Sequence, residues 1–275
     1  MMMRSASRQF RACGVVPLAA LLLSAMLAGC TETRETPEPK PSTKAAAAPA
    51  TETKPETKTE AEPSTVTVPA DPEEGPPSVL STLEPGKWVS LFTGKNLKGW
   101  RVVEKAEFEM HGKVEVKDGA IRMGVGMPFT AITWTGDFPQ ENYEVELEAM
   151  RTSGVDIFAA TTFPVGEAHV SFIVGGWGDT VVGISSVDDM NASENETTTV
   201  MTFDNNTWHR FRIRVTTAKI EAWVGKKQVV DLERKGHTFT LYGGVEPVAP
   251  FGVFTWQSEG ALRNIRFRRV KPEEK

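Results

Sequence analysis

Three glutamates alternate with apolar residues in the stretch Glu144-Val145-Glu146-Leu147-Glu148. In a β-strand, side chains at positions i and i+2 point to the same face and are about 6.6 Å apart along the backbone, so the three carboxylates would share one face. Direct hydrolysis of a glycosidic bond needs two carboxylates, roughly 5–5.5 Å apart for retention and 6.5–9.5 Å apart for inversion. The pattern therefore predicts Glu144, Glu146 and Glu148 as candidate catalytic residues. A solvated polar face of a sheet explains the same alternation.

Other residues could contact a sugar. His169 begins a predicted strand and is a candidate auxiliary base, with a packed or surface histidine as the alternative. The Gly-rich stretch 175–179 carries Trp177 and Asp179, and it would present one large ring on a flexible backbone, as stacking on a sugar requires. Core packing is the alternative for each tryptophan. Further candidate substrate-binding residues are Trp134, Asp156 and Trp256.

An oxygen-rich segment follows the Gly-rich stretch. Its candidate metal ligands are Asp188, Asp189, Asn191 and Glu194, whose oxygen atoms suit Ca²⁺. The spacing differs from that of an EF-hand, so an exposed acidic loop without a metal is the alternative. The four histidines show no metal-binding spacing. The sequence also has no nucleophile elbow, phosphate-binding loop or dinucleotide fingerprint, which argues against serine hydrolases, nucleotide enzymes and dehydrogenases.

The first thirty residues have the pattern of an export signal. Three arginines precede an apolar run over 15–27 that is too short to span a bilayer stably. The run ends in Leu-Ala-Gly-Cys30, which resembles a bacterial lipobox; an ordinary secretory signal is the alternative. We expect residues 1–29 to be a signal peptide and Cys30 to carry the lipid that anchors the protein in the cell envelope. Thr31, in place of an aspartate, favours the outer membrane.

The rest of the chain divides by composition. Residues 30–84 are rich in Pro, Thr, Glu, Lys and Ala and predict a disordered linker, because they cannot bury enough apolar surface to offset chain ordering. All seven tryptophans lie in 85–271, which predicts one domain, and 272–275 form a charged tail. The mature domain has no cysteine, so it has no disulfide. A net charge of −5 argues against nucleic acid as a partner.

Short runs rich in Val, Ile, Thr, Phe and Trp alternate apolar with polar residues and are separated by turn signals. No stretch of ten or more residues in this domain has a helical period. The pattern predicts an all-β fold, with two packed antiparallel sheets in a jelly-roll sandwich. The predicted strands are Lys113–Lys117, Thr130–Trp134, Tyr143–Ala149, His169–Val174, Thr198–Phe203, His209–Thr216, Lys219–Val224, Phe251–Trp256 and Ala261–Arg269.

Three motifs carry a family resemblance. They are the opening Leu91-Phe92-x-Gly94-Lys95-x-Leu97-x-Gly99-Trp100, the central Asn206-x-Trp208 with the two strands after it, and the closing Phe251-Gly252-Val253 with Arg263-Asn264-Ile265. Together they resemble the 3-keto-disaccharide hydrolase domain family, which is grouped with concanavalin A-like lectins and glucanases. The resemblance implies a concanavalin A-like jelly roll, an exported setting and action on 3-keto-disaccharides or 3-keto-glycosides. The three glutamates also resemble, loosely, the Glu-x-Asp-x-Glu arrangement of family 16 glycoside hydrolases.

The chemistry implied by the family is elimination. A ketone at C3 of a sugar acidifies the hydrogen at C2, so the glycosidic bond can break if a base and an enolate stabiliser are present. However, the chain has Thr152-Ser153-Gly154-Val155 and then Asp156-Ile157-Phe158 where the family commonly has Asn-Ser-Gly-Ile and an arginine. Beyond this point, the family usually has a strand that bears Glu and Gln, and this chain has the different stretch 168–199 in its place. Two hypotheses remain: an envelope enzyme acting on 3-keto sugars, and a non-catalytic carbohydrate-binding lipoprotein.

Overall fold

The computed structural model describes residues 76, 77 and 79–272. The predicted signal peptide, the lipidation site Cys30, most of the predicted linker and the last three residues of the charged tail lie outside the described residues. Within the described part, no helix has the length and apolar character needed to cross a membrane.

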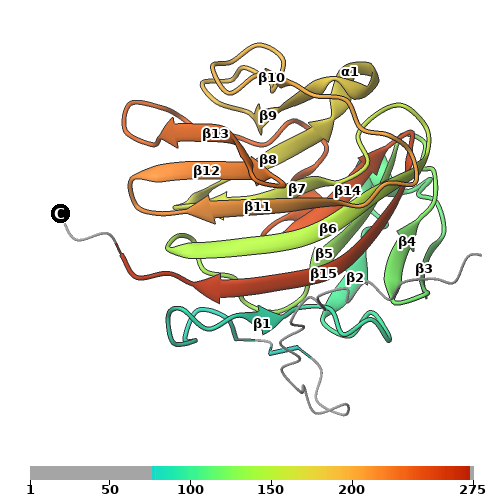
Figure 1. The fold of residues 1–275 in the computed structure, drawn as a ribbon, viewed down its shortest axis with the longest axis horizontal. Helices are drawn as coiled ribbons and strands as arrows, with labels where there is room; N and C mark the ends of the chain where they lie inside the picture. Colours follow the sequence, from blue (N-terminus) through green and yellow to red (C-terminus); the bar gives the residue numbers. More distant parts are fainter. Residues whose placement is uncertain (1–75, 78, 273–275) are drawn as a thin grey trace, which may run out of the picture. The chain divides into compact units, whose positions relative to one another are not determined.

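The described residues form two antiparallel sheets (Figure 1). Sheet A has the strand order β13-β12-β11-β6-β15-β4-β3, with β1 paired to β15, and sheet B has the order β10-β9-β8-β7-β14-β5-β2. The all-β, two-sheet prediction is therefore confirmed. The strands of sheet A are β1 (Val89–Ser90), β3 (Val114–Lys117), β4 (Ala120–Met123), β6 (Tyr143–Ser153), β11 (His209–Val215), β12 (Lys219–Val224), β13 (Lys227–Glu233) and β15 (Glu259–Arg269). Those of sheet B are β2 (Trp100–Val102), β5 (Phe129–Trp134), β7 (Ala160–Val165), β8 (Ala168–Gly175), β9 (Val181–Ser185), β10 (Thr199–Val200) and β14 (Gly252–Trp256).

The main core lies between the sheets, where the side chains that alternate inward from each strand meet. Val145 and Leu147 of β6 are fully buried there, and Phe172 of β8 belongs to the same cluster. Because side chains of a strand alternate between its faces, the glutamates between these residues must lie on the outer face of sheet A.

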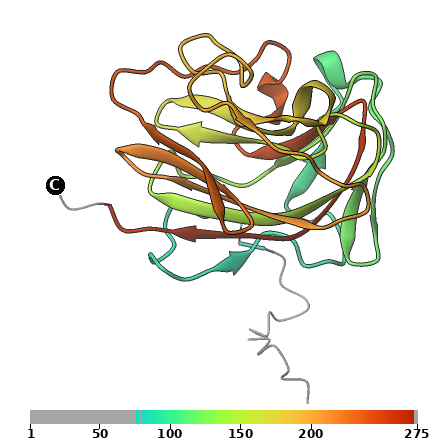
Figure 2. The same cartoon turned by 45° about the horizontal axis from the view of Figure 1, so that its top comes forward.

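Sheet B is covered on its outer face too, by a second apolar cluster. Phe129 of β5, Ile173 of β8 and Phe254 of β14 pack there with Val245 and Val248. The cover comes from η1 (Ala106–Phe108), η2 (Glu246–Val248) and the short turn α1 (Gly176–Asp179), and Figure 2 shows α1 and η2 on the same side of sheet B. With both faces covered, every residue of β5 and of β7 is buried.

Burial on both faces hides two strands from the sequence pattern. Strands β7 and β9 are buried on both faces, so they lack a clear apolar–polar alternation. Strands β1, β2, β4 and β13 were not predicted either, and the run predicted over 198–203 contains only the two residues of β10. The region 175–199 supplies β9, which pairs with both β8 and β10.

The folded domain begins earlier than the predicted boundary at residue 85. Leu80, assigned to the linker, is 0% exposed in the main core. The backbone N–H groups of Leu80 and Ser81 donate to the carboxylate of Asp137, over 2.5 and 3.0 Å. The short segment also contains Val79 and Leu83, and Leu83 packs against the main core. Three apolar residues next to a long polar, Pro-rich stretch are a weak sequence signal, so composition alone assigned the segment to the linker.

Candidate functional site

A pocket of about 360 Å³ opens on the outer face of sheet B. Its volume falls within the range of small-molecule sites. Strands β5, β8, β9 and β14 provide the floor, and the turn α1 and the loops near residues 156, 191 and 242 provide the walls. The lining residues are Phe129, Asp156, Ile157, Ser171, Ile173, Trp177, Ser185, Asn191, Tyr242, Val245, Phe254 and Trp256.

Three aromatic rings surround this apolar floor. Trp177 is 49% exposed and Tyr242 is 57% exposed, both unusual for rings of this size. Trp256 is half-buried, and its ring packs edge-to-face on Phe129 with ring centroids 4.6 Å apart. Exposed aromatic side chains beside an apolar floor can stack on the C–H faces of a sugar, while nearby polar groups orient its hydroxyls.

The polar groups of the pocket are few. Asp156 carries the only carboxylate among the lining residues of the described chain. Its Oδ1 accepts a hydrogen bond from the backbone N–H of Ile157 over 2.8 Å, and its Oδ2 accepts one from Gly178 over 3.4 Å. The N–H of Asp156 donates to Ser258 Oγ over 3.0 Å. These contacts fix the carboxylate next to the turn that carries Trp177.

The turn α1 holds Trp177 in an unusual backbone conformation. The φ angles of Trp177, Gly178 and Asp179 are 51°, 75° and 83°, all in the left-handed region. This region costs a non-glycine residue free energy, so the surroundings must compensate. Gly175, with φ 71°, begins the turn, and a Cβ there would lie 3.1 Å from the Phe158 ring. The turn therefore has a specified shape and is not a loose Gly-rich loop.

Arg151 supplies much of the compensation from the end of β6. Its side chain is 3% exposed and pairs through Nη1 with Asp179. It also donates from Nε to Asn205 and from Nη2 to the carbonyl oxygen of Phe203. Asp179, a predicted substrate-binding residue, is thus absent from the pocket lining and instead fixes the base of the Trp177 turn.

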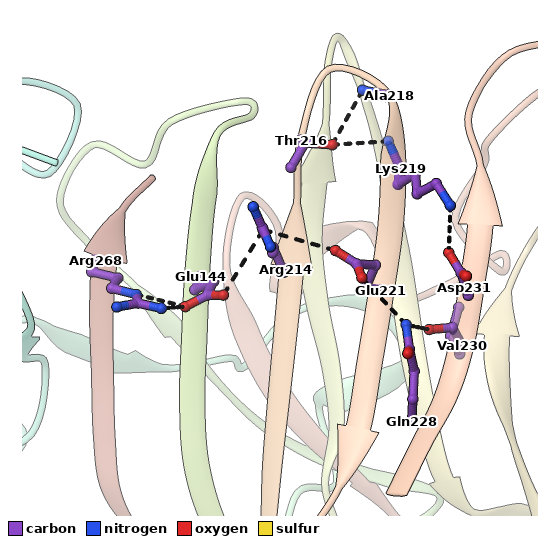
Figure 3. Close-up of polar contacts among 10 residues, drawn as sticks. All are labelled: Glu144, Arg214, Thr216, Ala218, Lys219, Glu221, Gln228, Val230, Asp231 and Arg268. Carbon is purple, nitrogen blue, oxygen red and sulfur yellow. Dashed lines mark hydrogen bonds and ion pairs between the residues drawn. The ribbon is translucent and has the colours of Figure 1, made fainter. Parts of the chain in front are cut away.

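The three candidate catalytic glutamates share one face, as predicted, but that face is the outer side of sheet A. Each pairs with arginine. The ion pairs shorter than 3 Å are Arg268–Glu144, Arg210–Glu146, Arg266–Glu146 and Arg263–Glu148. Figure 3 shows Glu144 between Arg268 and Arg214, in a row that continues to Glu221. None of the three lines the pocket on sheet B, so the structure does not bring them together with Trp177, and their catalytic role stays a prediction.

Two further candidates lie outside the pocket lining. Trp134 is 2% exposed in the main core and packs edge-to-face on Trp100, so core packing is the correct interpretation for it. His169 is half-buried on β8, and burial lowers its pKa. It lies on the same face of the strand as Ser171, two residues before it, but does not line the pocket. In contrast, Asp156, Trp177 and Trp256 do line it, and their role in binding stays a prediction.

The predicted metal ligands are used in loop contacts. Asp188 accepts hydrogen bonds from His237 Nδ1 over 2.7 Å and from the backbone N–H of Thr238 over 2.8 Å. The Thr238 and His237 hydrogen bonds lower the pKa of Asp188. Among the described residues, no three His, Cys, Asp or Glu side chains are grouped to hold a metal ion. The Ca²⁺ hypothesis does not fit this arrangement; the segment instead joins two loops that form the pocket wall.

Sequence reasoning missed much of the lining. Phe129, Ile173 and Phe254 lie in strands that were recognised wholly or in part, but alternation cannot show which outer face carries a pocket. Tyr242 had a usable signal. It directly precedes Gly243-Gly244, and an aromatic residue next to glycines was the feature that identified Trp177.

Several solved structures are similar to this chain. A laminarinase from Flavobacterium sp. UMI-01 is 13% identical over 68% of this chain and 100% of that one, with a TM-score of 0.45. A carbohydrate binding module from Bacillus subtilis is 10% identical over 64% of this chain and 99% of that one, with a TM-score of 0.41. A non-specific endo-beta-1,3(4)-glucanase from family GH16 is 12% identical over 71% of this chain and 94% of that one, with a TM-score of 0.44.

A comparison with curated proteins found no match. The model of one protein family, described as the 3-keto-alpha-glucoside-1,2-lyase-like domain, matches residues 87–271. The match covers well over half of the chain and includes every strand of both sheets. It also agrees with the resemblance carried by the opening, central and closing motifs. The chain therefore belongs to the 3-keto-alpha-glucoside-1,2-lyase-like domain family.

Proposed function

We propose that this domain binds a carbohydrate in the pocket on sheet B, and that the chain is exported and held at the cell envelope, in the outer membrane, by a lipid on Cys30. The observation that supports binding is the arrangement of Trp177, Tyr242 and Trp256 around an apolar floor, with Asp156 and Asn191 at the same pocket. Ring faces and a few fixed polar groups are what sugar recognition requires. Family membership points to the same class of ligand.

Binding accounts for this pocket better than hydrolysis by a carboxylate pair. Such hydrolysis needs two carboxyl groups on either side of the scissile bond. Asp156 is the only acid among the lining residues of the described chain, and the three glutamates of β6 lie on the other sheet in ion pairs with arginine.

A second candidate function is elimination from a 3-keto-glycoside, which is supported by the family and needs only one base. Asp156 would take the proton from C2, the C2–H electrons would form the enolate, and the bond from C1 to the glycosidic oxygen would break as the enolate collapses. The departing oxygen would take up a proton. Ser171 and Ser185 are the lining residues whose hydroxyls could donate to the enolate oxygen.

The test uses a panel of disaccharides together with their 3-keto derivatives. Titration calorimetry measures binding, and chromatography measures release of the leaving sugar. Trp177→Ala should weaken binding roughly tenfold, because an exposed stacking ring is lost. The matched control is Trp88→Ala on the outer face of sheet A, which should leave affinity unchanged.

Asp156→Asn separates the two functions. If the pocket only binds, no sugar is consumed by the wild type, and the variant keeps its affinity within about threefold. If the domain is a lyase, the wild type releases the leaving sugar and the variant loses this activity. Failure of every sugar to bind, or equal behaviour of Trp177→Ala and Trp88→Ala, would contradict both.

A further inference from the structure

The outer face of sheet A carries rows of charged side chains that cross its strands. The row nearest the end of β15 contains Arg268, Glu144, Arg214 and Glu221, which face one another in register on β15, β6, β11 and β12. Opposite charges alternate along it (Figure 3). Next to it, Lys219 pairs with Asp231 and Glu233. Two arginines balance two glutamates within the row itself, and the Lys219 group adds one lysine and two carboxylates, an excess of one negative charge.

The next two rows are not balanced. In register, the second row is Arg266, Glu146, Arg212 and Trp223, and the third is Arg263, Glu148 and Arg210. With Lys226 in the β12–β13 turn, these rows hold five cations and only two carboxylates, an excess of three positive charges. The whole chain has a net charge of −5, so this area reverses the overall sign. It crosses four neighbouring strands, about 15 Å at the usual spacing.

A surface depression of about 270 Å³ lies in this area, which we call the Arg212 site; it is lined by Glu146, Arg210, Arg212, Trp223, Gly225 and Lys226. Glu146 is already neutralised by Arg210 and Arg266. Among the described residues, no carboxylate pairs with Arg212. Its guanidinium carbon lies instead 3.8 Å from the centre of the Trp223 ring.

Stacking on Trp223 prepares Arg212 to bind an anion. A guanidinium that lies on an aromatic ring is held in one plane, and its N–H donors point outward in that plane. Such a group matches the two oxygens of a carboxylate or sulfate in a bidentate hydrogen bond. Lys226 is exposed beside it on the turn and adds a second, adaptable donor.

We propose that the Arg212 site binds the carboxylate or sulfate groups of an acidic polysaccharide. Charge complementarity supports the anion, and the length of the positive area suits several units of an extended chain more than a single small ion. Carbohydrate is the ligand class of the family to which the domain belongs. The proposal is independent of the pocket, because the two sites lie on opposite sheets; an acidic polymer would be held by sheet A and a small sugar by sheet B.

The test measures retention of the full mature chain in gels that contain polygalacturonate, dextran sulfate or neutral dextran. The first two should retain the protein at low salt and release it as salt rises, since exposed charges are screened. Neutral dextran should not retain it. Arg212→Gln combined with Lys226→Ala should weaken retention roughly tenfold. The matched control, Arg101→Gln combined with Lys98→Ala, removes two exposed cations elsewhere and should have little effect.

Lys226→Glu is a second variant, which changes only an exposed turn residue and should also weaken retention. Thermal unfolding shows that each variant is folded, and sugar binding in the sheet B pocket should be unchanged in all of them. Equal loss in the control pair would show that net charge alone matters and would overturn the proposal. The proposal would also be overturned if a gel retained a variant of the site as strongly as the wild type, or if neutral dextran retained the wild type as strongly as the acidic polymers. Stronger retention by single-stranded DNA than by polygalacturonate would overturn it too.

Discussion

At the residue scale, Arg151 explains how an exposed tryptophan is kept in place. It extends from β6 of sheet A and reaches the turn that follows β8 of sheet B, where it pairs with Asp179. It also lies 5.5 Å from the centre of the Phe158 ring. A lysine cannot reproduce these contacts, because it has no planar fork of donors.

Arg151→Lys should therefore lower the free energy of unfolding by about 1–3 kcal/mol, since one ammonium group cannot replace the hydrogen bonds of the guanidinium to Asp179, Asn205 and Phe203 at once. Sugar affinity should fall as well, because Trp177 is no longer fixed. Urea denaturation and calorimetry measure the two effects. Arg122→Lys, whose half-buried side chain pairs with the exposed Asp118, is the control and should change neither. Unchanged affinity in a folded Arg151→Lys protein would show that Trp177 needs no such support.

At the element scale, strand β6 shows both the power and the limit of the sequence pattern. Alternation correctly indicated that Glu144, Glu146 and Glu148 share one face while Val145 and Leu147 enter the core. It could not show which sheet the strand joins or what faces the carboxylates, because these depend on pairing with β11 and β15, more than sixty residues away. The same limit hid the floor of the pocket and the contact between Asp179 and Arg151.

Glu146→Gln tests the structural interpretation of this strand. The side chain is 8% exposed and accepts hydrogen bonds from Arg210 and Arg266, whose own side chains are 53% and 40% exposed. Loss of its charge should lower the free energy of unfolding by about 1–2 kcal/mol, because solvent partly screens both arginines. Sugar binding in the sheet B pocket should not change.

Chemical denaturation and calorimetry check this prediction. Glu148→Gln, whose carboxylate is 27% exposed and has one arginine partner, should cost less. Loss of sugar binding or turnover in a stably folded Glu146→Gln protein would restore a functional role for the carboxylates of β6.

At the scale of the whole domain, composition and periodicity were enough to predict the all-β class and two sheets. They placed the start of the domain too late, because Val79, Leu80 and Leu83 are too few in so short a segment to establish a strand or helix period. Its backbone bonds to Asp137 and its place in the core make the segment 79–84 part of the fold.

Removal of residues before 85 should therefore lower the free energy of unfolding by about 2–4 kcal/mol, the cost of deleting a buried leucine. Leu80→Ala in the full chain should produce most of this loss, whereas Thr82→Ala, at an exposed position, should produce almost none. Urea denaturation monitored by tryptophan fluorescence measures all three. Equal stability of the shortened and full chains would place the boundary at 85 after all.

The position of the final strand has a consequence for how the domain is made. Strand β15 is the last strand of the described residues, yet it lies inside sheet A, paired with β6 on one side and with β4 and β1 on the other. Until β15 has been synthesised and is free to pair, β6 lacks one neighbour and the β3–β4 hairpin has no link to the rest of the sheet. Sheet A can therefore be completed only once residues 259–269 are free to pair, and a chain that ended before Glu259 would lose the strand that joins the two parts of the sheet.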